Sequence, residues 1–264
     1  MVSVLGMFVS GVRGDRKMSK DKISQILIKR GSKLLNSPRR FYEFTKNKEA
    51  DKLLNNIEEL PHAFVLACVM DRQIPAERAW SIPYLISKEI GGFEFKRLLS
   101  LKKDYIRKMF LEKKLHRFNE VMSENFYLAI QKIKNDYNGD ASNIWKDKPK
   151  SATVVRRFLE FNGVGIKIAT MITNILVREF KIPMKDYICI DISPDIHVKR
   201  VFKRIGFIPK NASNDELIFS ARELNPNYPG VFDLSCWEIG RKWCRPNNPN
   251  CKRCYLNKFC KKNF

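Results

Sequence analysis

Near its carboxyl end the chain carries four closely spaced cysteines, and these constrain its fold more than any other feature. Cys244, Cys251, Cys254 and Cys260 follow the spacing C-x6-C-x2-C-x5-C within the run CRPNNPNCKRCYLNKFC. Four thiols this close, separated by Pro and Asn, are typical of a metal cage. Sulfur-only ligation suits either an iron–sulfur cluster or zinc. The sequence therefore predicts a loop that four thiolates hold in order around a metal.

The chain is strongly basic, both in this loop and throughout its length. Arg245, Lys252 and Arg253 lie between the cysteines, where no acidic residue occurs. In all, 50 Lys and Arg against 28 Asp and Glu give a net charge of +22 over 264 residues. Such an excess indicates nucleic acid as the first partner to expect, with a generic basic surface as the alternative. A hydrophobic content of 44% is enough for one large or two small domains.

The remaining segments exclude several protein classes. Cys68, Cys189 and Cys236 have apolar neighbours, so we expect buried free thiols there. With the other four cysteines committed to a metal, no disulfide framework is left, which favours a reducing cytosol. No window of eighteen apolar residues occurs, so no membrane span is predicted. Residues 1–17 are expected either to be disordered or to precede a true start at Met18.

Helical periodicity dominates the pattern of apolar residues. Helices are expected within 94–112, 116–134 and 151–161, and the stretch 62–90 is strongly apolar. Strand signals are scarce, and prolines interrupt the later half of the chain. The predicted fold class is all-α, with about ten helices.

Residues 153–180 predict a helix–hairpin–helix. Two glycines in the run 162–165 permit a tight turn, and the apolar residues that follow recur at helical spacing. A glycine turn that opens a helix exposes backbone N–H groups, which bind phosphate with help from the helix dipole. An ordinary αα-hairpin is the alternative. The candidate DNA-binding residues of the turn are Asn162, Gly163, Val164 and Gly165.

Lys167 strengthens the functional interpretation of this hairpin over that of an ordinary αα-hairpin. It lies in the first turn of the second helix and off its apolar stripe. The positive end of the helix dipole and partial burial both disfavour an ammonium there, which makes the amine available as a nucleophile. The alternative interpretation is a solvated lysine in a lysine-rich chain.

A second candidate side chain, Asp195, lies near the start of a later helix. Ser193 is expected to cap this helix and Pro194 to occupy its first position, so that Asp195 falls in the first turn. The dipole keeps the carboxylate ionised, ready to stabilise a cation or act as a base, although a carboxylate there is common for stability alone. Asp191 is a competitor, whereas His197 is expected to be structural.

Three motifs stand in one order: G-V-G-x-K-x-A, D-x-H-V-x-R-V and the cysteine spacing. Together they resemble the endonuclease III branch of the helix–hairpin–helix DNA glycosylases, over roughly residues 60–260. The resemblance implies a two-domain fold, with a six-helix barrel at 52–189. Segments 18–51 and 190–264 would form the second domain, where the four cysteines hold a [4Fe–4S] cluster. Four-thiolate zinc is the alternative.

The same resemblance implies an activity on DNA. Lys167 matches the lysine that forms a Schiff base with C1′ of the sugar, and Asp195 matches the essential carboxylate. The expected substrate is duplex DNA with a damaged, mismatched or modified base, or an abasic site, nicked by β-elimination after base removal. A monomer is expected, in the cytoplasm with the nucleoid, or in the nucleus of a eukaryote.

Two departures from the family leave the substrate base open. In the segment 66–80, Met70 stands where the family carries a polar residue, usually Gln, that fills the gap left by a flipped base. Met70, Arg72 and Gln73 are the candidates for that role here. The spacing from lysine to aspartate is also longer, as an insertion near 181–194 would explain. A monofunctional glycosylase, a non-catalytic binder of damaged DNA and an iron–sulfur redox protein stay as alternatives.

Overall fold

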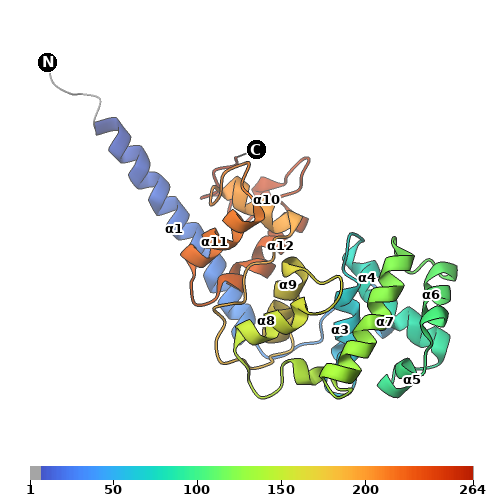
Figure 1. Cartoon of the computed structure of the whole chain (residues 1–264). Coiled ribbons are helices and arrows are strands. Elements are labelled where there is room, and N and C mark those ends of the chain that lie inside the picture. Colours follow the sequence, from blue (N-terminus) through green and yellow to red (C-terminus); the bar gives the residue numbers. More distant parts are fainter. Residues whose placement is uncertain (1–6, 264) are drawn as a thin grey trace. The chain divides into compact units, whose positions relative to one another are not determined.

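A computed structural model describes the backbone of residues 7–263 and the side chains from residue 20 onward (Figure 1). Over those residues the chain forms twelve α-helices, three short 3-10 helices and no strand, which confirms the all-α prediction. The helices gather into two compact units. We call Pro38–Asp186 the continuous unit, and Met1–Ser37 with Tyr187–Phe264 the discontinuous unit. No described helix is long and apolar enough to cross a membrane.

The continuous unit is built around one fully buried helix, α3 (Pro61–Val69). Its sequence PHAFVLACV is apolar on every side, as expected of a helix enclosed by others. Around it pack α2 (Lys48–Asn55), α4 (Ala76–Ile90), α7 (Asn119–Asp136), α9 (Ile166–Arg178) and the 3-10 helix η1 (Ala141–Ile144). The unit also contains α5 (Phe95–Leu99), α6 (Lys103–Glu112) and α8 (Ser151–Leu159).

Two of the predicted apolar stretches are interrupted. The stretch 62–90 divides into α3 and α4, because a tight turn follows Met70 and Gln73 takes a left-handed φ of 55°. The segment 94–112 divides into α5 and α6, because Ser100 and Leu101 donate to carbonyls three residues earlier and close the first helix. The remaining two predicted helices appear as α7 and α8.

The discontinuous unit joins segments that are distant in sequence. Helix α1 (Met7–Asn36) packs against α12 (Asp233–Lys242) and the 3-10 helix η2 (Pro229–Phe232). A β-carbon at Gly31 would collide with the Val231 carbonyl, so α1 approaches η2 where it has no side chain. The unit also contains α10 (Ile196–Ile205), α11 (Asn214–Leu224) and η3 (Cys251–Arg253).

The unit boundaries differ from the expected ones at the amino-terminal side. Residues 38–51 belong to the continuous unit rather than with the cysteine loop, because α2 packs on α3 and α4. The buried Asp51 carboxylate also holds the preceding segment by accepting from the Thr45 amide at 2.8 Å. Residues 1–17 were expected to be disordered or to precede a true start at Met18. Residues 7–17 are part of α1, and residues 1–6 lie outside the described part of the chain.

Candidate functional site

The predicted helix–hairpin–helix is present, formed by α8 and α9 with a glycine turn between them. Gly163 has a φ of 84°, a conformation that side chains disfavour. A β-carbon there would lie 2.5 Å from Asn125 Nδ2, so the turn needs glycine for space as well. Val164 is buried and anchors the turn, while Asn162, Gly163 and Gly165 are exposed.

The start of α9 is open to a ligand. Gly165 precedes the helix with extended backbone, and a β-carbon there would meet no atom within 4 Å. The first N–H groups of any helix lack partners within the helix, and they carry the positive end of its dipole. The exposed turn therefore leaves these backbone donors accessible, and phosphate binding by them stays a prediction.

Lys167 is held by a carboxylate that the sequence motifs do not single out. Its Nζ donates to Oδ2 of Asp71 at 2.7 Å. The Asp71 side chain is only 6% exposed, whereas the lysine side chain is 35% exposed. The amine therefore has a buried carboxylate on one side and solvent on the other. In the sequence, Asp71 directly follows the apolar run that forms α3. An acidic residue beside a buried helix needs a partner, and this feature could have identified Asp71 as a candidate.

The loop after α3 lies beside the hairpin, but one of its candidate DNA contacts is wrong. Met70 caps the carboxyl end of α3 and is 0% exposed, so its side chain belongs to the core and cannot insert into DNA in this conformation. Arg72 and Gln73 are exposed. An Arg72 Nη1 atom lies 4.0 Å from the position of a β-carbon at Gly163, so loop and hairpin share one surface.

His116 fixes the carbonyl of Met70 and thereby the base of this loop. Its Nδ1 accepts from the Phe118 amide at 3.0 Å, so Nε2 carries the hydrogen that the Met70 carbonyl accepts at 3.2 Å. This arrangement requires the neutral ring. Burial lowers the pKa of His116, in keeping with that state.

In the discontinuous unit, Asp195 is itself the cap of α10. Its carboxylate accepts from the His197 amide at 2.7 Å, and the helix begins at Ile196. The expectation that Ser193 caps this helix is wrong, because Asp195 does so. The Ser193 amide donates instead to Asp233 at 2.9 Å. Asp195 as a whole is half-buried.

The competing carboxylate, Asp191, has a structural role. Arg222 grips both of its oxygens, with Nε at 2.7 Å and Nη2 at 2.8 Å. The Asp191 side chain is buried, and the ion pair ties the segment before α10 to α11. This two-point engagement leaves Asp195 as the more available carboxylate of this segment.

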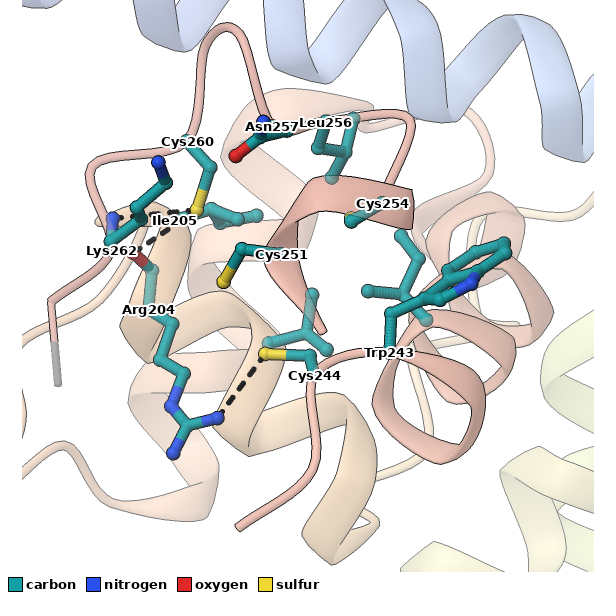
Figure 2. Close-up of a pocket in the computed structure, with 12 residues that line it drawn as sticks. Arg204, Ile205, Trp243, Cys244, Cys251, Cys254, Leu256, Asn257, Cys260 and Lys262 are labelled. Carbon is teal, nitrogen blue, oxygen red and sulfur yellow. Dashed lines mark hydrogen bonds between the residues drawn. The ribbon is translucent and has the colours of Figure 1, made fainter. Parts of the chain in front are cut away.

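The four cysteines of the predicted cage line a single pocket (Figure 2). The sulfurs of Cys244, Cys251 and Cys260 face one another in that view. Arg204 of α10 donates to Cys244 Sγ at 3.5 Å, and the Lys262 amide donates to Cys260 Sγ at 3.4 Å. The other lining residues are Val201, Ile205, Ile239, Trp243, Cys254, Leu256 and Asn257.

The chemistry of this donor set fits a sulfur-ligated metal group. Burial, and then the neighbouring thiols, raise the pKa of Cys254, and burial likewise raises that of Cys260. Thiolates here need a bound cation to offset their desolvation and mutual repulsion. In the described part of the chain, no three His, Cys, Asp or Glu side chains converge tightly enough for one metal ion. The four sulfurs thus surround a pocket instead of meeting at one point.

Helix α10 connects Asp195 to the cysteine loop within the same unit. Arg200 donates to the Cys244 carbonyl at 2.7 Å and to the Gly240 carbonyl at 2.8 Å. A β-carbon at Gly240 would lie 2.7 Å from His197 Cβ, so α12 packs on α10 through a glycine. His197 is thus a packing residue, as expected. The basic residues of the cysteine loop are all exposed: Arg245, Lys252 and Arg253.

All seven cysteines are free thiols in the structure. Cys68 and Cys236 are buried, as predicted, and burial raises the pKa of both well above its usual value. Cys189 is only half-buried, so the prediction of a third core thiol is wrong. It lies in the irregular segment between α9 and α10.

Comparison with known proteins gives one relative by sequence and several by structure. Endonuclease III of Thermotoga maritima is 31% identical over 107 residues, which are 40% of this chain and 45% of that protein. The match therefore spans less than half of the relative's length. No family model matches the chain.

Solved structures of similar fold cover 92% of the chain. They include a trapped endonuclease III–DNA covalent intermediate, with a TM-score of 0.60, 16% identity and 96% of that chain covered. A non-covalent endonuclease III–DNA complex has the same TM-score and identity, with 95% covered. A thermostable thymine-DNA glycosylase has a TM-score of 0.62, 18% identity and 98% covered.

Proposed function

We propose that the chain, which has the fold of endonuclease III-like helix–hairpin–helix proteins, is a DNA glycosylase of base excision repair with abasic-site lyase activity. One observation carries the proposal. A half-exposed lysine, Lys167, stands in the first turn of the helix that the glycine hairpin opens. A nucleophile beside a phosphate-binding turn is what attack on a sugar within DNA requires.

In the proposed reaction, the target nucleotide leaves the duplex, because its glycosidic carbon is inaccessible within the base stack. The neutral Lys167 amine forms a bond to C1′ as the base departs with the electrons of the glycosidic bond. Asp195 stabilises the positive charge that develops on the sugar. The resulting Schiff base makes the C2′ proton acidic, and its removal expels the 3′ phosphate, which nicks the strand.

The proposed DNA contacts come from exposed groups in both units. In the continuous unit these are the backbone of the turn 162–165 and the side chains of Arg72 and Gln73. Of these, Gln73 or Arg72 would fill the gap left by the extruded base. The basic residues of the cysteine loop would add phosphate contacts. Because phosphate contacts release counterions, affinity should fall steeply as salt rises.

The pocket of four cysteines would hold a [4Fe–4S] cluster. Bound there, the cluster would cross-link the loop 244–260 and carry no step of the reaction. Iron and acid-labile sulfide analysis, with visible absorbance, tests this assignment against zinc. A colourless protein with stoichiometric zinc would exclude the cluster.

The experiment that tests the activity is borohydride trapping. The protein is incubated with duplex DNA that contains one abasic site, and borohydride reduces any Schiff base to a stable protein–DNA adduct. We expect an adduct from the native protein and none from Lys167→Ala. Lys185→Ala serves as the control, since Lys185 lies in the same unit outside the hairpin and should leave trapping unchanged.

A panel of duplexes with oxidised, alkylated or mismatched bases then tests base removal. The absence of an adduct, with DNA binding intact, would contradict the lyase activity. Base loss without an adduct would then indicate a monofunctional glycosylase that uses water with Asp195. No base loss from any duplex would indicate a non-catalytic DNA-binding protein.

A further inference from the structure

We propose that Asp71 is the proton acceptor that converts Lys167 into a nucleophile, which rests on the proposed function of Lys167. Oδ2 of Asp71 lies 2.7 Å from the lysine Nζ, within the distance at which a proton passes along a hydrogen bond. Both residues belong to the continuous unit. Asp195, which the family motif identifies as the essential carboxylate, remains free to stabilise the sugar.

The burial of Asp71 is difficult to explain by stability alone. Its side chain is 6% exposed, and a carboxylate this deep is unfavourable unless it is paired. Its partner among the described side chains is Lys167, whose own side chain is 35% exposed. A core position next to the fully buried Cys68 thus holds a charge that pairs with the candidate nucleophile.

The position of Asp71 is fixed by its surroundings. It follows the fully buried helix α3, and its amide donates to the Cys68 carbonyl at 3.0 Å. The preceding Met70 is buried in the core, and His116 holds its carbonyl. Because the carboxylate cannot easily move, the lysine amine is oriented with one side on Asp71 and the other open to solvent.

The proposed step is a proton transfer before bond formation. An ammonium has no lone pair and cannot attack carbon, so one Nζ–H bond must break. The proton passes to Asp71 Oδ2, and the electron pair of the broken bond stays on the nitrogen. That pair then forms the bond to C1′. At an abasic site, where C1′ is an aldehyde, the addition gives a carbinolamine, which loses water to become the Schiff base.

The variant Asp71→Asn distinguishes proton acceptance by Asp71 from its role in orienting Lys167. An amide oxygen still accepts a hydrogen bond from the ammonium, but it does not take up the proton. We measure single-turnover trapping on duplex DNA with one abasic site, from pH 7 to pH 9. The native protein and Lys167→Ala give the upper and lower limits. Glu49→Gln is the matched control, because it also neutralises one carboxylate of an ion pair in the same unit, at an exposed site.

The range from pH 7 to pH 9 avoids the protonation changes of His116 and Cys68, which lie near Lys167 and Asp71. His116 approaches from the segment before α7, and burial lowers its pKa, so its ring is neutral throughout. Cys68 of α3 lies beside the pair, and burial raises its pKa well above 9.0, so its thiol stays protonated. The comparison of Asp71→Asn with the native protein over this range therefore isolates the contribution of the Asp71 carboxylate.

We expect Asp71→Asn to trap at least tenfold more slowly than the native protein at pH 7. The rate should approach the native rate toward pH 9, because hydroxide and buffer replace the missing acceptor. DNA affinity should stay unchanged. Asp71→Glu, which restores a carboxylate, should recover part of the rate at pH 7. If Asp71→Asn folds poorly, the comparison of Asp71→Glu with Asp71→Gln decides the same question.

Two results would overturn the proposal. Native or faster trapping by Asp71→Asn at pH 7 would mean that the carboxylate is idle or restrains the lysine. A loss by the same factor at every pH would mean that Asp71 has a structural role only. Both results differ from failure of the proposed function, in which the native protein itself gives no adduct.

Discussion

Asp191 and Arg222 form a two-point ion pair, in which both guanidinium donors lie within 2.8 Å of carboxylate oxygens. This ion pair gives Asp191 a different environment from Asp195, which stands four residues later in sequence. Asp191 is occupied and buried, whereas the half-buried Asp195 caps α10 through a single backbone contact. The two carboxylates should therefore respond differently to the same substitution.

Asp191→Asn should lower stability and spare the chemistry. Loss of the ion pair should reduce the free energy of unfolding by about 1–3 kcal/mol, below the full cost of breaking a buried pair because Arg222 is 43% exposed. Urea denaturation measures this change. Single-turnover excision or trapping, measured per folded molecule, should stay within about twofold of native. A tenfold loss there would give Asp191 the role assigned to Asp195.

Asp195→Asn should have the opposite effect. Asparagine caps helices as well as aspartate does, so the free energy of unfolding should change by less than about 0.5 kcal/mol. If Asp195 stabilises the cation that develops on the sugar, as proposed, loss of its carboxylate should slow base removal by about a hundredfold or more. Excision kinetics on a substrate duplex check this, with Asp195→Ala as a comparison that lacks the cap as well. Unchanged excision by the Asn variant would argue against an electrostatic role.

Substitutions at the two glycines of the hairpin should affect different properties, stability at Gly163 and DNA affinity at Gly165. Gly163→Ser places a side chain at a φ of 84° against Asn125, which should cost about 1–3 kcal/mol of stability. Gly165→Ser enters open space at a position where serine is a good cap, so stability should be unchanged. If phosphate approaches this turn, Gly165→Ser should nonetheless weaken DNA binding by roughly tenfold. Equal affinity for native and Gly165→Ser would place the backbone contact elsewhere.

Mild acid should destabilise the continuous unit. Burial lowers the pKa of both His62 and His116 below the usual 6.5. Both rings are neutral in the folded state, so as pH falls below about 6.5 the unfolded chain takes up protons first. The free energy of unfolding should therefore be greatest above pH 6.5 and fall on acidification, down to the lowered pKa values. Urea titrations at pH 7.5 and 5.5 measure the loss, and His62→Gln should reduce it. Equal stability at both pH values would contradict the prediction.

The features that follow from local pattern were predictable, and those that depend on tertiary contact were not. Periodicity and the glycine pair indicated the helical class and the hairpin, because both are local properties of the backbone. The burial of Met70 was missed because its neighbours in sequence do not reveal that the core closes over the end of α3. Asp71 was missed for a related reason, since its partner Lys167 is 96 residues away.

Similarly, the capping role of Asp195 depends on where α10 begins, and the ends of helices are the features that sequence patterns define least sharply. The cysteine spacing predicted a shared site, because four thiols within so short a segment cannot separate far. Arg200 and Arg204 of α10 make hydrogen bonds to the cysteine loop, about 40 residues later in sequence. No local sequence pattern predicts these contacts.

The packing of α1 against η2 affects the order in which the chain folds during synthesis. The continuous unit is complete once residue 186 has been made, so it has every contact it needs while translation proceeds. Helix α1 is synthesised before this unit but finds its partner around Val231 only much later, after roughly 10–40 seconds of elongation at about 5–20 residues per second. Until then its packing face is uncovered, although the continuous unit is already folded. A truncation in the last third of the message would thus release a folded continuous unit together with an uncovered helix α1, to which chaperones would bind.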